Sequence, residues 1–229
     1  LPRDPEAGRR LSEAQRQLAW AEALTASGRF RDATRALFDL GAEAHSIGYR
    51  PLVARVRLAD ARVQEGMGRP AAARDFARRA FSESLAAREP RDAIGAATVL
   101  AGLEASLGRG DDAQQWVETA SGLMDAHGAS SEARVSLLRV RAQILRARGD
   151  LDGARSKLEQ ALQLLSRDMA PRLVAAEIAE EVGALEMDEG RAGEALRAYQ
   201  EALAIRREAL GPTAPRVRTL EERVAGLER

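Results

Sequence analysis

Few side chains in this sequence are of types that do chemistry. There are two histidines, one lysine and no cysteine, so thiolate nucleophiles, thiolate metal sites and disulfides are excluded. His45 and His127 each stand shortly before a glycine, and neither has an acidic or histidine partner at metal-ligand spacing. We interpret both as C-terminal helix residues, because the negative end of a helix favours a protonated imidazole.

The motifs of common enzyme classes are missing from the sequence. It contains no G-x-x-x-x-G-K-[ST], no H-E-x-x-H and no G-x-S-x-G. The glycine-rich stretch "GMGRPAA" (66–72) lacks the lysine and the preceding strand of a phosphate loop. Adjacent acids such as Asp111 and Asp112 are typical of solvated faces and helix starts. We therefore expect no enzyme activity, no metal and no cofactor.

Charge and hydropathy exclude further classes of partner. The 35 basic and 35 acidic side chains balance, so nothing draws the chain to nucleic acid. No apolar run reaches the ~18 residues of a membrane span, and we expect no membrane contact. The sequence opens on Leu1 rather than methionine, so we expect a piece of a longer protein. We also expect this piece to be located in the cytoplasm.

A short pattern, Gly-Arg/Asp-x-x-x-Ala, recurs along the whole chain. It begins at Gly28, Gly68, Gly108, Gly149 and Gly190, at intervals of 40 or 41 residues. A fixed period of this length is typical of repeat architectures.

Around each glycine the apolar residues follow a helical period, and two columns consist of small residues. Five positions after the glycine stand Ala33, Ala73, Ala113, Ala154 and Ala195. Seven positions before it stand Ala21, Ala61, Ala101, Ala142 and Gly183. Apolar residues follow the first column at offsets of four and then three more, as on one helix face. Small residues on both sides of a turn predict two closely packed antiparallel helices.

Prolines and polar caps set the expected boundaries. Pro51, Pro90 and Pro171 open first helices, Pro70 opens a second helix, and Ser130 caps another. These signals predict a linker over 1–9 and one domain over 10–229, with repeats at about 12–48, 49–89, 90–128, 130–168 and 170–211, and a cap at 215–229. We expect Trp20 and Trp116 to pack between repeats, with anchoring of a partner as the alternative.

These residues carry a resemblance to a known family. The Gly-x-x-x-x-Ala turn and the small residue before it resemble the tetratricopeptide repeat, and the ending "EALAIRREALGPTAPRV" is similar to the kinesin-light-chain variety. That variety usually has histidine before its proline, where Ala214 stands here. The resemblance implies an all-α fold: a right-handed α-solenoid of five antiparallel helix pairs plus a C-terminal capping helix, in which first helices line a groove.

The same resemblance places the groove residues 13, 10, 6 and 3 positions before each repeat glycine. Arginines at these positions could hydrogen-bond a carboxylate, a phosphate or the backbone of an extended partner segment. Alternatively, they pair with acids of neighbouring repeats and bind nothing. The candidate partner-binding residues are Arg55, Arg62, Arg139, Gln143, Arg146, Glu177 and Glu180.

The chain also resembles the C-terminal extensions of bacterial serine/threonine protein kinases. That likeness implies a non-catalytic, regulatory protein–protein interaction module of a larger signalling protein, with a protein or peptide partner. The alternative is the effector-sensing domain of a large bacterial transcription activator, which would bind a small ligand. A self-assembly scaffold is a third reading.

Overall fold

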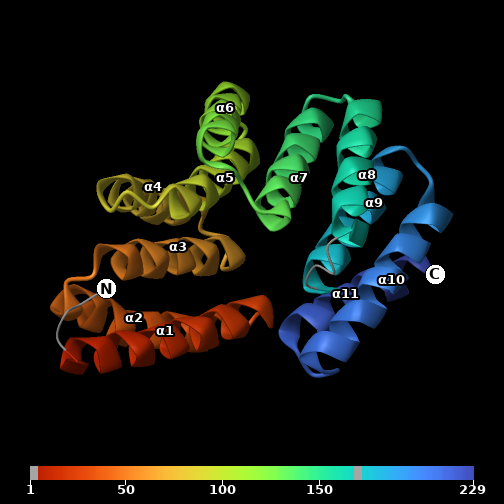
Figure 1. Ribbon diagram of the computed structural model, residues 1–229. Coiled ribbons are helices and arrows are strands. Elements are labelled where there is room, and N and C mark those ends of the chain that lie inside the picture. The colour runs from red at the N-terminus through yellow and green to blue at the C-terminus, as the bar shows by residue number, and fades with distance from the viewer. Residues whose placement is uncertain (1–4, 168–171) are drawn as a thin grey trace. The chain divides into compact units, whose positions relative to one another are not determined.

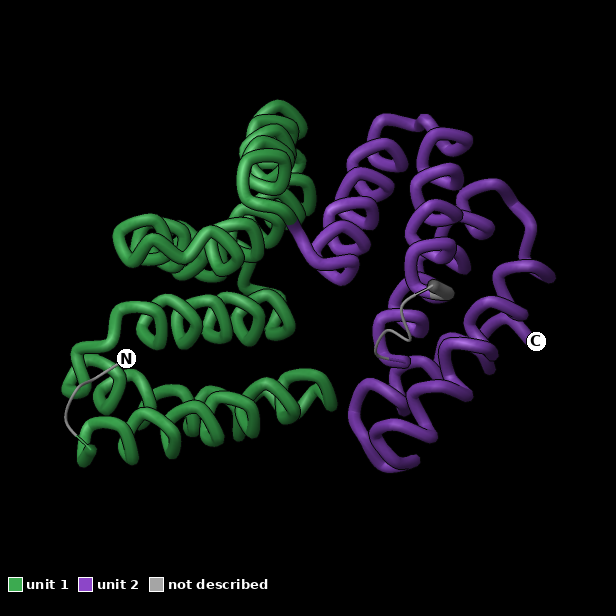
Figure 2. Tube along the Cα trace, viewed as in Figure 1, with its two compact units in different colours: residues 1–128 green, residues 129–229 purple. Residues whose placement is uncertain are grey.

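The computed structural model describes residues 5–167 and 172–229, which form eleven α-helices and no strand (Figure 1). The chain divides into two compact units, Leu1–Gly128 and Ala129–Arg229 (Figure 2). Unit 1 contains α1 (Pro5–Ala26), α2 (Phe30–Ile47), α3 (Arg50–Gly66), α4 (Pro70–Ala86), α5 (Pro90–Ser106) and α6 (Gly110–His127). Unit 2 contains α7 (Ser131–Ala147), α8 (Leu151–Arg167), α9 (Arg172–Asp188), α10 (Ala192–Leu210) and α11 (Pro215–Leu227).

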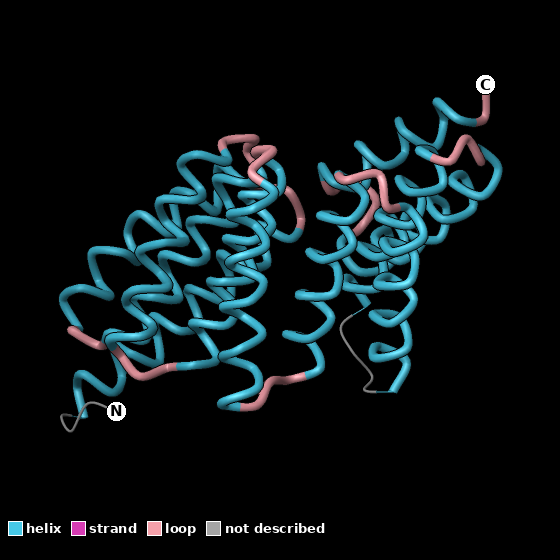
Figure 3. The backbone as a smooth tube through the Cα atoms, turned by 90° about the horizontal axis from the view of Figure 1, so that it is seen from above, coloured by secondary structure: helices cyan, strands magenta, loops and turns pink. Residues whose placement is uncertain are grey.

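One turn geometry joins the two helices of every pair. Gly28 adopts a left-handed conformation with φ of 83°, and the backbone N–H of Arg29 donates to the carbonyl of Leu24 at 2.9 Å. The same five-residue backbone bond, at 2.8 to 3.0 Å, closes the turns at Gly68, Gly108, Gly149 and Gly190. Because a left-handed residue is required there, glycine recurs at this position. Short loops connect the helices, which make up most of each unit (Figure 3).

Both small-residue columns lie in the core, as the sequence predicts. All ten members are buried, and each alanine among them is at most 3% exposed. The apolar residues that follow on the second helices are also buried, among them Leu37, Val117, Leu158 and Tyr199. The all-α helical repeat fold expected from the periodicity is therefore confirmed.

Replacing Ala154 with leucine should overpack the contact between α7 and α8. Ala154 is 1% exposed and shares a core cluster with Ala142 and Leu158. The added carbons should lower the free energy of unfolding by about 1–3 kcal/mol, measured by urea denaturation. Glu159→Leu, at an exposed position of the same helix, is the matched control. A midpoint for Ala154→Leu equal to that of the control would contradict close packing here.

The predicted helix starts match the structure where it is described. Pro70, Pro90 and Pro215 are the first residues of their helices, and Pro51 is the second residue of α3. The Oγ of Ser130 accepts from the backbone N–H of Ala133 at 3.3 Å and caps α7. The prediction for Pro171, and the boundary between the fourth and fifth repeats, lie outside the described residues.

The lead-in to the first repeat is shorter than expected. A linker is predicted over 1–9, but α1 already begins at Pro5. Proline is tolerated at the first position of a helix, and Glu6 places an acid beside the positive helix end. Both signals were present in the sequence, so this part of the linker prediction is wrong.

The two tryptophans differ in environment. Trp116 on α6 packs edge-to-face on Phe81 of α4, with ring centroids 5.1 Å apart, which confirms packing between repeats. Trp20 on α1 is 59% exposed, so the same prediction is wrong for it. Ala23 is exposed too, although its counterparts Val63 and Leu103 are buried. Within the described chain α1 is the first helix, so no earlier pair covers this face.

The expected helix-terminal histidines and the terminal cap are present. His45 lies in the last turn of α2, where its Nδ1 is 2.8 Å from the carbonyl oxygen of Gly41. His127 is the last residue of α6. Helix α11 buries Val217, Leu220 and Val224 in a core cluster shared with α9 and α10, as its sequence stripe predicts.

Candidate partner-binding surface

In unit 1, ion pairs connect successive first helices on one face. The Nε of Arg55 on α3 donates to Asp92 Oδ2 on α5 at 2.9 Å. Arg62, seven residues further along α3, has its Nη1 3.9 Å from Glu22 Oε1 on α1. We call the surface formed by the groove positions of α3 and α5, with Arg55 and Arg62 at its edge, the first-helix face of unit 1.

The α5 part of this face consists of small side chains. Gly95, Thr98, Gly102 and Ala105 occupy its groove positions, and Thr98 and Gly102 are buried. The hydroxyl of Thr98 donates to the carbonyl of Ile94 at 2.9 Å, so it is already satisfied within its own helix. This stretch therefore offers backbone and small apolar atoms beside exposed guanidinium groups.

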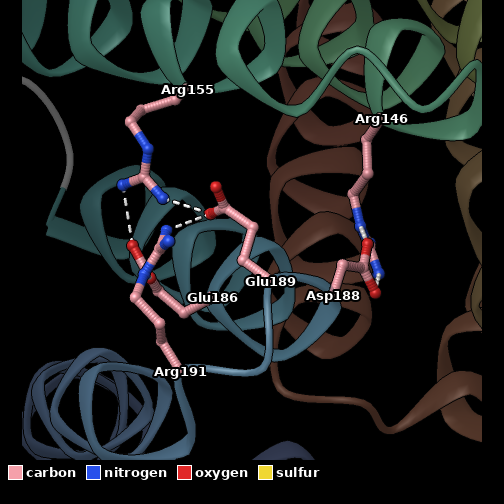
Figure 4. Close-up of polar contacts among 6 residues, drawn as sticks. All are labelled: Arg146, Arg155, Glu186, Asp188, Glu189 and Arg191. Carbon is pink, nitrogen blue, oxygen red and sulfur yellow. Dashed lines mark hydrogen bonds and ion pairs between the residues drawn. The ribbon is translucent and has the colours of Figure 1, made fainter.

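In unit 2, the predicted arginines are already paired with acids of the next repeat. Arg139 of α7 lies between two carboxylates of α9: its Nη1 is 2.5 Å from Glu177 Oε2 and its Nη2 is 2.7 Å from Glu181 Oε1. Arg146 forms two hydrogen bonds to Asp188, the longer of them 3.1 Å from Nη2 to Oδ1 (Figure 4). The pairing alternative raised by the sequence therefore describes both residues.

Burial and charge act against each other at Arg139. Its side chain is 21% exposed, and burial lowers the pKa of its guanidinium. The charges of Glu181 and Glu177 and their hydrogen bonds outweigh that effect, so the net pKa of Arg139 is raised. Burial also raises the pKa of Glu181, although the charge of Arg139 opposes it. We infer that Arg139, Glu177 and Glu181 form a charged cluster in which the ion pairs offset the free-energy cost of removing the charges from water.

The other predicted residues of unit 2 do not form one site. Glu180 accepts a hydrogen bond from the buried Arg206 of α10, so it is tied to a second helix. Gln143 is exposed on α7 between Arg139 and Arg146. Glu177 also lies 3.9 Å from Arg216 of α11. Of these groups, Gln143 is exposed, whereas Glu177 and Glu180 are half-buried.

Sequence reasoning missed a buried acid beside two of the turn glycines. Glu186 is 5% exposed and accepts from Arg155 of α8 at 2.7 Å and from Arg191 of the turn at 2.5 Å (Figure 4). Hydrogen bonding by Arg155, then by Arg191, lowers the pKa of Glu186. Glu104 is fully buried in unit 1, with Arg78 at 3.4 Å and Arg109 at 3.5 Å. A glutamate four residues before "GR" was the available signal; its role is to hold consecutive helices together.

Asp60 of α3 should make unit 1 less stable as the pH rises. Burial raises the pKa of this half-buried carboxyl to about 6, partly offset by the charge of Arg57. The folded state then holds a proton that the unfolded state releases near pH 4, so stability falls between about pH 4 and 6 and stays lower above. Asp60→Asn should therefore stabilise the protein at pH 7.5 by about 1–2 kcal/mol and change little at pH 4.

Urea denaturation at the two pH values checks this prediction. Asp39→Asn, at an exposed position of α2, is the control and should leave the pH dependence unchanged. Equal effects of Asp60→Asn at both pH values would show that burial of the charge is not its cause.

Metal binding and membrane spanning have no candidate among the described residues. Within 5–167 and 172–229, no three histidine, cysteine or acidic side chains gather where they could hold a metal ion. Over the same described ranges, no helix combines the length and apolarity that crossing a bilayer requires.

The fold and this surface define the class of protein: an all-α helical-repeat protein whose pairs are joined by one recurrent glycine turn. A family profile described as tetratricopeptide repeat matches residues 176–215. Residues 176–215 thus match a tetratricopeptide repeat, and most of the chain is similar in fold to solved tetratricopeptide-repeat and kinesin-light-chain structures. Among curated proteins, none matches the sequence significantly.

Solved structures of this fold are similar over most of the chain. One is a putative kinesin light chain from Podosopora anserina, with 16% identity, a TM-score of 0.54, and coverage of 86% of this chain and 97% of that chain. TTC0263 from Thermus thermophilus has 24% identity, a TM-score of 0.61 and coverage of 93% and 98%. A Rap protein complexed with competence and sporulation factor has 12% identity, a TM-score of 0.64 and coverage of 94% and 66%. At these identities the likeness concerns the fold alone.

Proposed function

We propose that this chain is a non-catalytic module of a larger signalling protein and binds an extended segment of a partner protein along its first helices. The observation that carries the proposal is the first-helix face of unit 1, where the accessible Arg55 reaches α5 with its small residues and the accessible Arg62 lies toward α1. The resemblance to extensions of bacterial serine/threonine kinases supports a kinase as the larger protein. The Rap complex supports the use of this fold to hold a partner.

The two units contribute differently to the proposed binding. The side chains of Arg55 and Arg62 are 46% and 47% exposed, and the Arg62 pair is long. Exposed ion pairs contribute about 0–1 kcal/mol, so both guanidiniums can exchange their present acid for a partner carboxylate at little cost. Arg139 is more enclosed, and Arg146, Glu177 and Glu180 are paired as well. We assign these four to holding the fold, and Gln143 to contact with the partner.

Site-specific photo-crosslinking in the source cell tests the proposal. A photoreactive residue at Ala105, on the first-helix face, should capture a defined segment of one protein. The same residue at Arg35, exposed on the second helix α2, should not. Arg55→Glu combined with Arg62→Glu should reduce the crosslink at least tenfold.

The matched charge-reversal control is Arg31→Glu with Arg35→Glu, at exposed positions of α2. Equal capture from both crosslinking positions, or equal losses in both double variants, would place binding elsewhere. A small molecule that co-purifies with the chain, without any crosslinked protein, would favour the effector-sensing alternative.

A further inference from the structure

We propose that a cluster of arginines in unit 1, away from the first-helix face, binds a phosphate group. The cluster, here called the basic pocket, is lined by Arg57 of α3 and by Arg78, Arg79, Ser82 and Glu83 of α4. These side chains border a shallow cavity of about 380 Å³. Guanidinium groups match phosphate oxygens in geometry as well as in charge.

Arg57 is the least satisfied cation of the pocket. Its Nε is buried and has no hydrogen-bond partner among the described residues. Its Nη2 lies 3.5 Å from the Nε2 of His45. This distance is long for a hydrogen bond, and the imidazole carries no negative charge to pair with the guanidinium. The side chain forms no ion pair within the described ranges, and buried polar groups without partners are costly. An anion in the cavity would supply the missing acceptor.

The α4 arginines keep most of their hydrogen-bonding capacity. Arg79 is exposed and forms no ion pair in the described part of the chain. Arg78 has its Nη2 3.4 Å from Glu104 Oε1, which leaves its other donors available. Ser82 donates its hydroxyl proton to the carbonyl of Arg78 at 3.1 Å, so it offers no donor to an anion, and the arginines supply the donors.

The charge of the lining residues favours a doubly charged ligand. Three guanidiniums and one carboxylate, that of Glu83, line the cavity. Glu104 lies beside Arg78, and the charge of Arg57 acts on the half-buried Asp60. A phosphate monoester carries about −1.5 to −2 charges at neutral pH and three acceptor oxygens. A carboxylate would leave more of this charge uncompensated. The group can come from a phosphorylated side chain of a protein or from free phosphate.

The basic pocket is separate from the proposed partner-binding surface. Arg57 is two residues from Arg55, which turns it by roughly 200° around the α3 axis. Its other lining residues belong to the second helix α4, and its neighbour His45 belongs to α2. A result at one surface therefore does not decide the other.

NMR titration of the whole chain, labelled with ¹⁵N at its arginine Nε atoms, tests the proposal. Inorganic phosphate is added at constant ionic strength, and then a phosphoserine pentapeptide and its unphosphorylated form. We expect saturable shifts of the Arg57 and Arg79 signals with phosphate and with the phosphopeptide, and none with the unmodified peptide. A phosphopeptide that binds at least tenfold more tightly than phosphate identifies a phosphorylated protein as the source, and equal affinities identify free phosphate.

Variants decide whether the pocket itself is responsible. Arg57→Gln and Arg79→Gln should each weaken binding at least tenfold, whereas Arg35→Gln and the Arg55→Glu/Arg62→Glu double variant should not. Arg79 is exposed, so its variant is expected to fold even if Arg57→Gln does not. Binding that does not saturate by 20 mM phosphate would have a free energy weaker than roughly −2.3 kcal/mol. That result would overturn the proposal. An equal loss in Arg35→Gln, which indicates general charge attraction, would overturn it as well.

Discussion

Replacing Gly183 with alanine is expected to lower the free energy of unfolding of unit 2 by about 3 kcal/mol. A Cβ at Gly183 of α9 would lie 2.7 to 2.9 Å from three ring atoms of Tyr199 on α10. The tyrosine is 3% exposed, and the guanidinium of Arg223 lies 5.2 Å from its ring centroid, so the ring has little room to move. Alanine favours a helix by about 1 kcal/mol over glycine, which offsets only part of the overpacking.

A double-mutant cycle measured by urea denaturation separates this contact from other effects of the substitution. In a Tyr199→Leu background the smaller side chain frees the space, so Gly183→Ala should be neutral or stabilising. Gly193→Ala is the control, because nothing lies within 4 Å of a Cβ at that position of α10. A loss for Gly183→Ala that is unchanged in the Tyr199→Leu background would contradict the steric explanation.

The repeat architecture could be predicted because its determinants are local. A left-handed glycine and one backbone bond fix each turn, and the helical period fixes which residues face inward. One turn of the same kind lacks the glycine signal. Arg88, between α4 and α5, adopts a left-handed φ of 56° without being glycine, and the same backbone bond closes its turn, from Glu89 to Ser84 at 2.9 Å.

Features that depend on neighbouring helices could not be read from the sequence. The columns that contain Gly183 and Tyr199 were both predicted, but not that the glycine makes space for the tyrosine ring. Trp20 was expected to pack between repeats because its helix matches the others, but its side chain is 59% exposed on the first helix of the described chain. Periodicity shows which face of a helix is apolar, and not what lies against that face.

The sequence assigned the candidate arginines to first helices but did not give their ion pairs. The offsets place both Arg55 and Arg139 on the groove side of a first helix, 13 and 10 positions before the repeat glycine, yet one has a half-exposed pair and the other is held by two acids. Arginine side chains are long and flexible, so each can reach acids of several turns. The choice among them depends on the spacing of neighbouring helices, which only the coordinates define.

Replacing Arg139 with methionine is expected to lower the free energy of unfolding at pH 7.5 by about 2 kcal/mol, between the values for exposed and for buried ion pairs, because the three side chains are partly enclosed. Methionine preserves much of the apolar contact of the arginine stem, so the loss reports mainly the charge left on Glu181 and Glu177. Arg146→Met removes a more exposed pair and should cost less than about 1 kcal/mol. Comparable losses in the two variants would contradict a special role for burial at Arg139.

The pH dependence of this loss distinguishes an uncompensated carboxylate from lost packing. Burial already raises the pKa of Glu181, and removal of the opposing Arg139 charge should raise it further. The folded variant can then take up a proton as the pH falls, so the penalty should be largest at pH 7.5 and clearly smaller at pH 5. Adding Glu181→Leu should recover most of the stability, because replacing both charges with apolar groups removes the unpaired ion. If the loss is the same at both pH values and persists in the double variant, Arg139 stabilises unit 2 by packing, and the ion-pair explanation is wrong.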